Sequence, residues 1–153
     1  MTIRPLERRD LPGLCADLAR LPLLQRYGRD AARLRVDLEA ALARGDGLLV
    51  AEAAPERVLG LAWFLAAGTL GMGGYLRLIA LAPEATGSGA GARLLQAFES
   101  EVARQSRHAF LLVSDFNQAA QRFYERHGYR RAGALPGLVL PDVAEILYWK
   151  VLR

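Results

Sequence analysis

The chain has 153 residues, of which 52% are hydrophobic, and this is enough apolar material for the core of one domain. Its formal net charge is +4, but the arginines are scattered and many have acidic neighbours, which favours a solvated basic surface over a nucleic-acid-binding face. The single cysteine, Cys15, excludes an internal disulfide, and no signal peptide or membrane-spanning apolar run is evident, so we expect a cytoplasmic protein with no membrane partner.

The first half alternates helical and strand-like segments. In chain order the sequence predicts a strand at residues 2–7, helices from about Asp10 and over about Arg29–Arg44, strands at 48–53 and 58–67, and a glycine-rich connector over Gly68–Gly74. Asp10 is a suitable N-cap for the first helix, with Pro12 in its first turn. The turn signal around Pro55 makes the two strands an antiparallel hairpin.

The second half alternates strands and helices more regularly. We expect strands at 75–82, 109–113, 129–135 and 144–152, with helices over about Gly89–Ser106 and 117–128, the latter stopped by Gly128. Strands that flank a helix in this way are parallel. The sequence therefore predicts a single α/β domain over residues 1–153, with a mixed twisted sheet of about seven strands flanked by about four helices.

Three glycines, Gly87, Gly89 and Gly91, alternate where a strand gives way to a helix. Unpaired N–H groups of the first helical turn, the helix dipole and close backbone approach at glycine together favour a phosphate or pyrophosphate. A Walker loop is excluded, because a lysine and a Ser or Thr would have to end it and Ala92 and Arg93 follow instead.

Two other interpretations of the glycines stay open at this point. The spacing fits the permissive dinucleotide form G-x-G-x-x-A, but the acidic ribose ligand expected about 20 residues further on is replaced by Arg107. The glycines could also serve only to let the helix and the strand pack closely.

Two longer stretches indicate a third interpretation. "IALAPEATGSGAGARLL" and, some 20 residues later, "LLVSDFNQAAQRFYERHGY" resemble the GNAT superfamily of acyl-CoA-dependent N-acetyltransferases. The resemblance is strong from about Tyr75 to Tyr129, and the order of elements on either side agrees with it. It implies a GNAT-type fold whose strand at Ile79 splays from its parallel neighbour at the cofactor site, and it implies acetyl-CoA as the cofactor.

The resemblance also implies roles for individual residues. Ile79, Ala80 and Leu81 would pair with the pantetheine arm, and Asn117 would contact that arm or its bound water. Tyr124 would lie near the thioester sulfur and protonate the departing thiolate. The pyrophosphate would receive backbone N–H groups from a loop that consists of Thr86, Gly87, Ser88, Gly89, Ala90, Gly91 and Ala92. The family prefers Arg or Gln where Thr86 stands, so affinity would depend more on the backbone and on Arg93.

Acetyl transfer to an amine needs a general base, and the sequence does not assign one. The two positions at which family members carry a glutamate hold Tyr75 and Leu112 here. Asp115 and Glu145 are the remaining carboxylates, each more typical of a structural role, and a water relay to a backbone carbonyl is equally allowed.

We expect structural roles for the other reactive side chains. We expect Cys15 to be a buried thiol, His127 to be stabilised by a helix end, and His108 to have no catalytic partner. No cluster has metal-ligand spacing, so we expect no metal.

The sequence thus predicts an N-acetyltransferase that acts by direct attack in a ternary complex. Its acceptor would be a primary amine on a small molecule or a peptide, bound by residues 21–30 and 135–142. These segments include three polar or charged residues that could contact it, Arg26, Tyr27 and Asp142. No nucleic-acid partner is expected, and a homodimer through the last strands is compatible with the sequence. The alternative is a non-catalytic acyl-CoA-binding regulator of the same fold.

Overall fold

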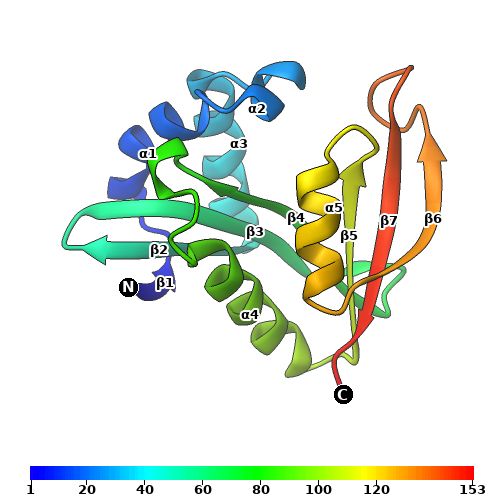
Figure 1. Ribbon diagram of the computed structural model, residues 1–153. Helices are drawn as coiled ribbons and strands as arrows, with labels where there is room; N and C mark the ends of the chain where they lie inside the picture. Colours follow the sequence, from blue (N-terminus) through cyan, green and yellow to red (C-terminus); the bar gives the residue numbers. More distant parts are fainter. The chain divides into compact units, whose positions relative to one another are not determined.

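The computed structural model describes residues 1–153, which form seven strands, five α-helices and two short 3-10 turns (Figure 1). In chain order the elements are β1 (Thr2–Pro5), η1 (Arg8–Asp10), α1 (Leu11–Leu18), α2 (Pro22–Arg26), α3 (Ala31–Arg44), β2 (Gly47–Ala54), β3 (Arg57–Thr69), β4 (Gly73–Leu81), η2 (Pro83–Ala85), α4 (Ala90–Ala103), β5 (His108–Ser114), α5 (Gln118–Arg126), β6 (Arg130–Pro136) and β7 (Ala144–Val151). None of the helices has both the length and the apolar character needed to cross a membrane.

The strands form a seven-stranded mixed sheet in the order β1-β2-β3-β4-β5-β7-β6. β4 and β5 are parallel, whereas β1 with β2, β2 with β3, β5 with β7 and β6 with β7 are antiparallel. This confirms the predicted α/β fold with a mixed sheet. One α-helix was not predicted: α2 has five residues, too few to show a helical period in the sequence, and begins at Pro22.

The glycine-rich connector is shorter than expected, because β3 extends to Thr69 and β4 begins at Gly73. The glycines at the start of β4 are strand residues that allow close packing. A Cβ on Gly73 would meet the carbonyl oxygen of His108 at 2.6 Å, and one on Gly74 would overlap the side chain of Val102. Sequence composition suggested a loop here, but the tertiary packing requires an extended backbone without side chains.

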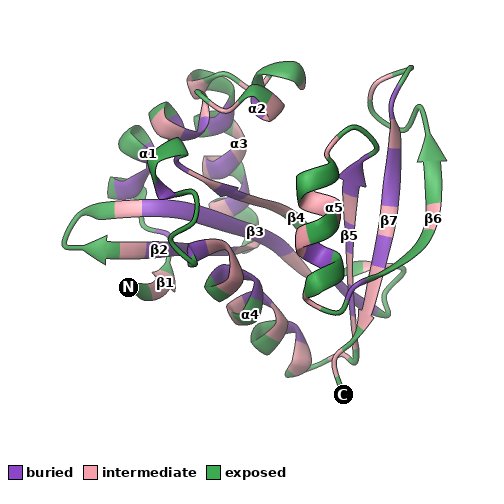
Figure 2. Cartoon of the chain, in the orientation of Figure 1, coloured by how far each residue is buried: buried purple, intermediate pink, exposed green.

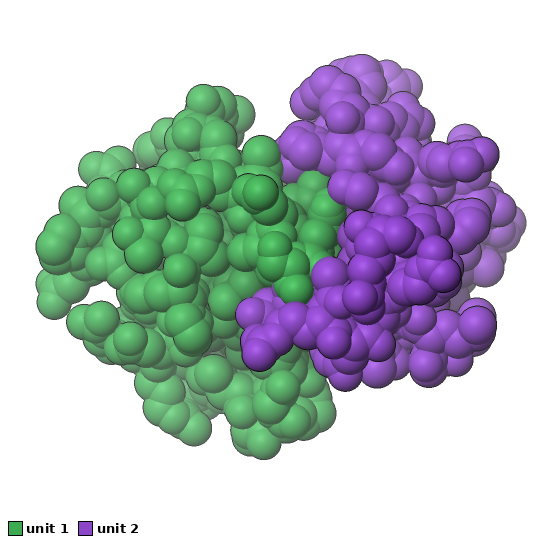
Figure 3. All heavy atoms as spheres, turned by 90° about the horizontal axis from the view of Figure 1, so that it is seen from below, with its two compact units in different colours: residues 1–64, 78–100 green, residues 65–77, 101–153 purple.

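The chain divides into two compact units, whose boundaries fall inside β3, β4 and α4 (Figure 3). Unit 1 comprises residues 1–64 and 78–100, and unit 2 comprises residues 65–77 and 101–153. We describe each unit by itself.

Unit 1 contains an apolar core on each face of its strands. Leu48 and Leu61 belong to a buried cluster with leucines of α1 and α3, including Leu14 and Leu38. On the opposite face the rings of Phe64 and Phe98 meet edge to face, with 5.2 Å between their centroids, so α4 packs there. The alternation of side chains along β3 produces this division, because neighbouring residues along a strand point to opposite faces and Leu61 and Phe64 are three residues apart.

An ion-pair network fixes the N-terminal end of unit 1. The Arg4 guanidinium donates two hydrogen bonds of 2.8 Å to the Asp10 carboxylate and a further one to Glu52. Asp10 also accepts from the backbone N–H of Glu7 at 2.8 Å. The expectation that Asp10 caps the first helix with its side chain is therefore wrong, although α1 does begin next to it. Its carboxylate is turned back toward Arg4, a partner that sequence spacing does not reveal.

Unit 2 is built on the pairing of β5, β7 and β6, with α5 packed on one face. The Tyr148 hydroxyl of β7 donates to the Glu125 carboxylate of α5 at 3.0 Å, and the rings of Tyr124 and Tyr129 pack with 5.7 Å between centroids. Gly128 ends α5 with a φ of 89°, as predicted. β6 is exposed along nearly its whole length (Figure 2).

The parallel register between β4 and β5 is short. It joins three residue pairs, from Gly74 with Ala109 to Leu76 with Leu111. β5 continues along β7 for its full length, and its last residue, Ser114, pairs with Glu145.

We predict that Asp10→Asn lowers the free energy of unfolding by about 3 kcal/mol at pH 7, because it leaves the Arg4 guanidinium without its main charged partner. The guanidinium lowers the pKa of Asp10, so the ionised carboxylate stabilises the fold above its unfolded pKa of about 4 and this contribution is lost as the pH falls below that value. Urea unfolding at pH 7 and pH 3 measures both effects.

The matched control is Glu39→Gln, which removes the exposed partner of Arg35 on α3 and should change stability by less than about 0.5 kcal/mol. An Asp10→Asn protein as stable as the wild type at pH 7 would contradict the prediction.

Candidate functional site

The glycine-rich loop of unit 1 leads from the end of β4 into α4. Just before it, the Ala82 N–H donates to the Leu59 carbonyl of β3 at 2.8 Å, and Ala82 and Ala85 are buried. Thr86, Gly87, Ser88 and Gly89 are exposed, and Ala90, the first residue of α4, is buried again. The loop is thus an exposed backbone segment between two buried anchors.

Gly87 and Gly89 have φ values of 81° and 85°, in the left-handed region that other residues rarely adopt. A Cβ built on either glycine would have no neighbour within 4 Å. At these two positions the interpretation that the glycines serve close packing of helix and strand is therefore wrong. The backbone conformation requires glycine, and the space beside it is open.

Several backbone N–H groups of the loop have no acceptor within the protein. The Ser88 N–H donates to the Ala85 carbonyl at 3.1 Å, and the Ala90 N–H donates to the Ser88 hydroxyl at 3.3 Å. The first backbone bond of α4 runs from the Arg93 N–H to the Gly89 carbonyl. No acceptor is found for the N–H groups of four residues, Gly87, Gly89, Gly91 and Ala92. With the positive end of the helix dipole, these groups can bind an anion.

Charged side chains on both sides of the loop are already paired. The Arg20 guanidinium donates two hydrogen bonds, of 2.6 and 2.8 Å, to the Glu84 carboxylate in η2. The Arg93 guanidinium donates to the carbonyl of Met1 at 2.7 Å. An anion that binds to the Arg93 guanidinium would thus have to compete with the Met1 carbonyl. Neither partnership has a signal in the sequence, since 64 residues separate the first pair and 92 the second.

The end of β4, where pantetheine contacts were expected, is also part of unit 1. Ala80 is buried, and Ile79 and Leu81 are half-buried. β3 approaches this segment so closely that a Cβ on Gly60 would lie 2.6 Å from the Ala80 carbonyl oxygen. Glycine in β3 thus permits the backbone of β4 to lie where it does.

Tyr124 and Asn117 lie in unit 2, on α5 and at its start. Tyr124 is buried, its ring lies edge to face with Phe123 at 5.1 Å, and burial raises the pKa of its hydroxyl. The hydroxyl therefore keeps its proton at neutral pH, as an acid must. The Asn117 Oδ1 accepts from the Ala120 N–H at 3.1 Å, so Asn117 is the N-cap of α5. Its side-chain NH₂ group is not used in this contact.

The two carboxylates considered as bases both have structural partners in unit 2. The Asp115 carboxylate accepts from the Ala144 N–H at 3.0 Å, which joins the end of β5 to the start of β7. Glu145 is buried and accepts from the Ser114 hydroxyl at 3.3 Å. Tyr75, on β4, has a pKa raised by burial and, to a smaller extent, by the Glu145 charge. Each carboxylate thus makes a hydrogen bond between the end of β5 and the start of β7.

The cysteine and the histidines are structural. Cys15 is buried, and burial raises the pKa of its thiol. The Trp149 indole donates to the His108 Nδ1 at 3.0 Å, and the His127 Nδ1 lies 2.8 Å from the Phe123 carbonyl. No group of three or more His, Cys, Asp and Glu side chains is arranged to hold a metal ion.

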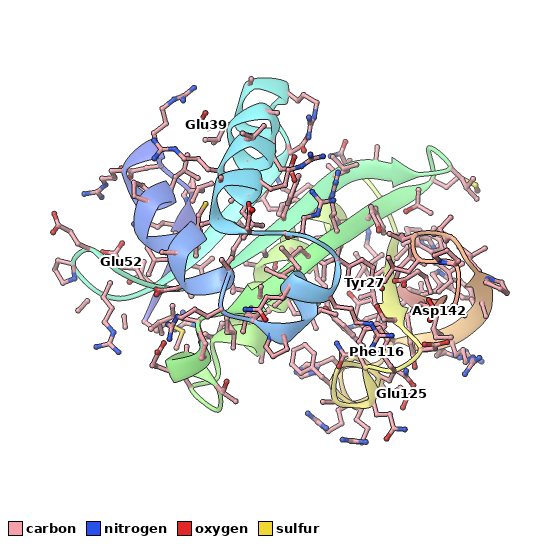
Figure 4. All side chains as sticks on the ribbon, turned by 90° about the horizontal axis from the view of Figure 1, so that it is seen from above. Tyr27, Glu39, Glu52, Phe116, Glu125 and Asp142 are labelled. Carbon is pink, nitrogen blue, oxygen red and sulfur yellow. The ribbon has the colours of Figure 1, made fainter.

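The segments expected to bind an acceptor amine belong to different units. Residues 21–30 contain α2 in unit 1, and Tyr27 follows that helix as its C-cap. Residues 135–142 form the end of β6 and the β6–β7 loop in unit 2, where Leu138 and Val139 are exposed. Figure 4 labels Asp142 on that loop and Phe116 at the turn into α5.

Comparison with protein-family models gives a match over most of the chain. The model of the acetyltransferase (GNAT) family matches residues 14–129, which include β4, the glycine loop, α4, β5 and α5. A search of curated proteins finds no match to this sequence.

Solved structures share the fold over the whole chain. Ard1 from Thermoplasma volcanium is 22% identical, with a TM-score of 0.80, over 99% of this chain and 97% of that chain. An aminoglycoside 6'-acetyltransferase type Ii is 24% identical, with a TM-score of 0.79, over 100% and 98%. An aminoglycoside 6'-N-acetyltransferase complexed with coenzyme A is 20% identical, with a TM-score of 0.76, over 100% and 98%.

We predict that Gly87→Ala and Gly89→Ala each lower the free energy of unfolding by about 1 kcal/mol, since the cost is a strained φ and not a steric clash. Gly13→Ala is the matched control. Gly13 lies in α1 and also has no neighbour within 4 Å of a built Cβ, so alanine there should stabilise the protein by about 0.5–1 kcal/mol. Thermal unfolding of the three variants measures these changes in stability. If all three variants changed the stability by the same amount in the same direction, the prediction would be contradicted.

Proposed function

Because the chain belongs to the GNAT family of acetyltransferases, we propose that it transfers an acetyl group from acetyl-CoA to a primary amine. The observation that carries this proposal is the glycine loop. Its positive-φ glycines, open space and unsatisfied N–H groups suit the pyrophosphate of CoA. The dinucleotide interpretation lacks its acidic ribose ligand, as Arg107 occupies that place.

The residues of this chain would divide the binding of acetyl-CoA as the family resemblance implies. The N–H groups of Gly87, Gly89, Gly91 and Ala92 would hold the pyrophosphate. The loop's other residues, Thr86, Ser88 and Ala90, would shape it, because their N–H groups are already bonded within the protein. Backbone groups of Ile79, Ala80 and Leu81 would pair with the pantetheine arm.

The chemistry at the thioester would depend on α5. Bound acetyl-CoA supplies the acetyl group in activated form, and a neutral amine attacks it directly in a ternary complex without a protein nucleophile. Tyr124 would give its proton to the leaving sulfur, and its buried, protonated hydroxyl supports this role. The NH₂ group of Asn117 would contact the cofactor arm while its oxygen caps α5.

The acceptor that we propose is an amine on a small molecule or a peptide. Two of the structural neighbours are aminoglycoside acetyltransferases, which supports an acceptor of small size. Arg26, Tyr27 and Asp142 are candidates for its recognition. No nucleic acid or membrane enters this proposal.

A second candidate function is an acyl-CoA-binding regulator that does not catalyse transfer. One observation favours it: both positions at which family members carry a base hold other residues, Tyr75 and Leu112, while Asp115 and Glu145 have structural partners. Such a regulator would bind CoA but would release no CoA thiol with any amine.

We expect acetyl-CoA and CoA to raise the melting temperature, and NAD and ATP to leave it unchanged. A ligand that binds only the folded state raises stability by about 2.7 kcal/mol at a concentration of one hundred times its Kd. Differential scanning fluorimetry with the four ligands in turn provides the measurement. A higher melting temperature with NAD alone would contradict the proposed cofactor. If none of the four ligands changed the melting temperature, a CoA-dependent function would be rejected.

With an amine that the wild type acetylates, we expect Tyr124→Phe to lower kcat by roughly 10²–10⁴-fold, because the leaving thiolate loses its acid. CoA binding should change little. Tyr148→Phe is the control: Tyr148 is also buried and bonds to α5 through Glu125, so it should lose stability but keep kcat. Unchanged turnover in Tyr124→Phe would remove Tyr124 from the acid role.

A further inference from the structure

The glycine loop has few contacts of its own that could hold it in one conformation. Gly87 and Gly89 have no side chains, no neighbour lies within 4 Å of a Cβ built on either, and Ser88 between them is exposed. Ordering such a backbone costs about 1–2 kcal/mol per residue in conformational entropy. A loop that must present several N–H groups to one ligand therefore depends on what fixes the segments beside it.

The segment immediately before the loop is fixed by an ion pair with α1. Arg20, which follows α1, meets Glu84 of η2 through two hydrogen bonds of 2.6 and 2.8 Å, each from a different guanidinium nitrogen to a different carboxylate oxygen. This fork geometry fixes direction as well as distance. Asp17 in the last turn of α1 accepts from the same guanidinium at 3.2 Å, so Arg20 is itself oriented. Glu84 lies three residues before Gly87, so the pair fixes the start of the loop.

The negative charge of Glu84 would weaken the binding of an anion to the loop if it were not paired. Between residues 82 and 93 Glu84 is the one acidic residue, and an unpaired carboxylate there would repel a phosphate bound three residues away. The Arg20 hydrogen bonds hold the pKa of Glu84 down, to about 2, so the carboxylate is ionised throughout the neutral range. Arg57 of β3 adds a smaller effect of the same sign.

We propose that Arg20 and Glu84 are positioning residues for the anion-binding loop: their ion pair holds η2 against the end of α1 and so presets the loop backbone for the pyrophosphate of CoA. This inference rests on the proposed CoA-dependent function. It assigns no contact between either side chain and the ligand, and it explains why an acidic residue stands beside a loop that binds an anion.

The experiment measures the Kd for CoA by isothermal titration calorimetry in four proteins and one control. These are the wild type, Arg20→Gln, Glu84→Gln and the charge-reversed pair Arg20→Glu with Glu84→Arg. The control is Arg35→Gln, which breaks an exposed Arg–Glu pair on α3 of the same unit. Melting temperatures are recorded for all of them.

We expect each single variant to raise the Kd for CoA by about fivefold, the reversed pair to recover at least half of that loss, and Arg35→Gln to bind as the wild type does. The sign for Glu84→Gln is decisive, because simple charge attraction predicts tighter binding once the carboxylate is neutral. Wild-type or tighter binding by Glu84→Gln would overturn the inference and leave the proposed function standing.

Failure of the wild type itself to bind CoA would reject the proposed function and the positioning role with it. Equal losses of melting temperature and affinity in Arg35→Gln would show that any exposed ion pair has this effect, and that result would also overturn the inference.

Discussion

The N–H groups at the start of α4, which have no acceptor within the protein, are the feature of unit 1 on which the proposed anion site depends. A backbone N–H without a protein partner is satisfied by water or by a ligand, and the helix dipole favours a ligand with negative charge. The protein leaves four such groups in one loop, while the Pro83 carbonyl, the Ala85 carbonyl and the Ser88 hydroxyl accept from the other three. The N–H groups of Gly91 and Ala92 are free because they belong to the first turn of α4, and the left-handed conformations of Gly87 and Gly89 set the direction of the backbone that leads into it. Glycine is thus needed for backbone direction, and side-chain packing does not enter.

The positive character of this loop comes from the backbone more than from side chains. The guanidinium of Arg93 contacts the Met1 carbonyl, and that of Arg20 is paired with Glu84. The proposed anion binding needs neither guanidinium, and Thr86, where the family prefers Arg or Gln, adds no charge. A ligand held chiefly by N–H groups is recognised by the geometry of its oxygens, which suits a pyrophosphate better than a single charge.

In unit 2 the group proposed to take part in the chemistry is a side chain, the hydroxyl of Tyr124. Burial disfavours the charged form of Tyr124 and so raises its pKa. The same apolar surroundings would raise the basicity of a thiolate beside it, so the two pKa values would move together and proton transfer would stay feasible. Asp115 and Glu145 are both engaged in joining β5 to β7. Their substitution would therefore disturb the sheet as well as any proton transfer.

The sequence by itself determined the local features of this protein. The order of strands and helices, the helix ends at Asn117 and Gly128, and the glycine loop before α4 all follow from short-range spacing and residue type, and the structure confirms them. These features were predictable because each depends on backbone preferences within a few residues. The short helix α2 was missed because five residues show no period.

Only the tertiary structure decided which of these groups meet. Asp10 is bound to Arg4 and not to the helix it precedes, Gly73 and Gly74 lie in a strand because neighbouring groups approach them, and Glu84 meets Arg20 across 64 residues. The physical reason is common to all three. Each contact forms only when the chain has folded, and no regular spacing in the sequence identifies it beforehand, whether its residues lie six apart, as Arg4 and Asp10 do, or far apart in the chain.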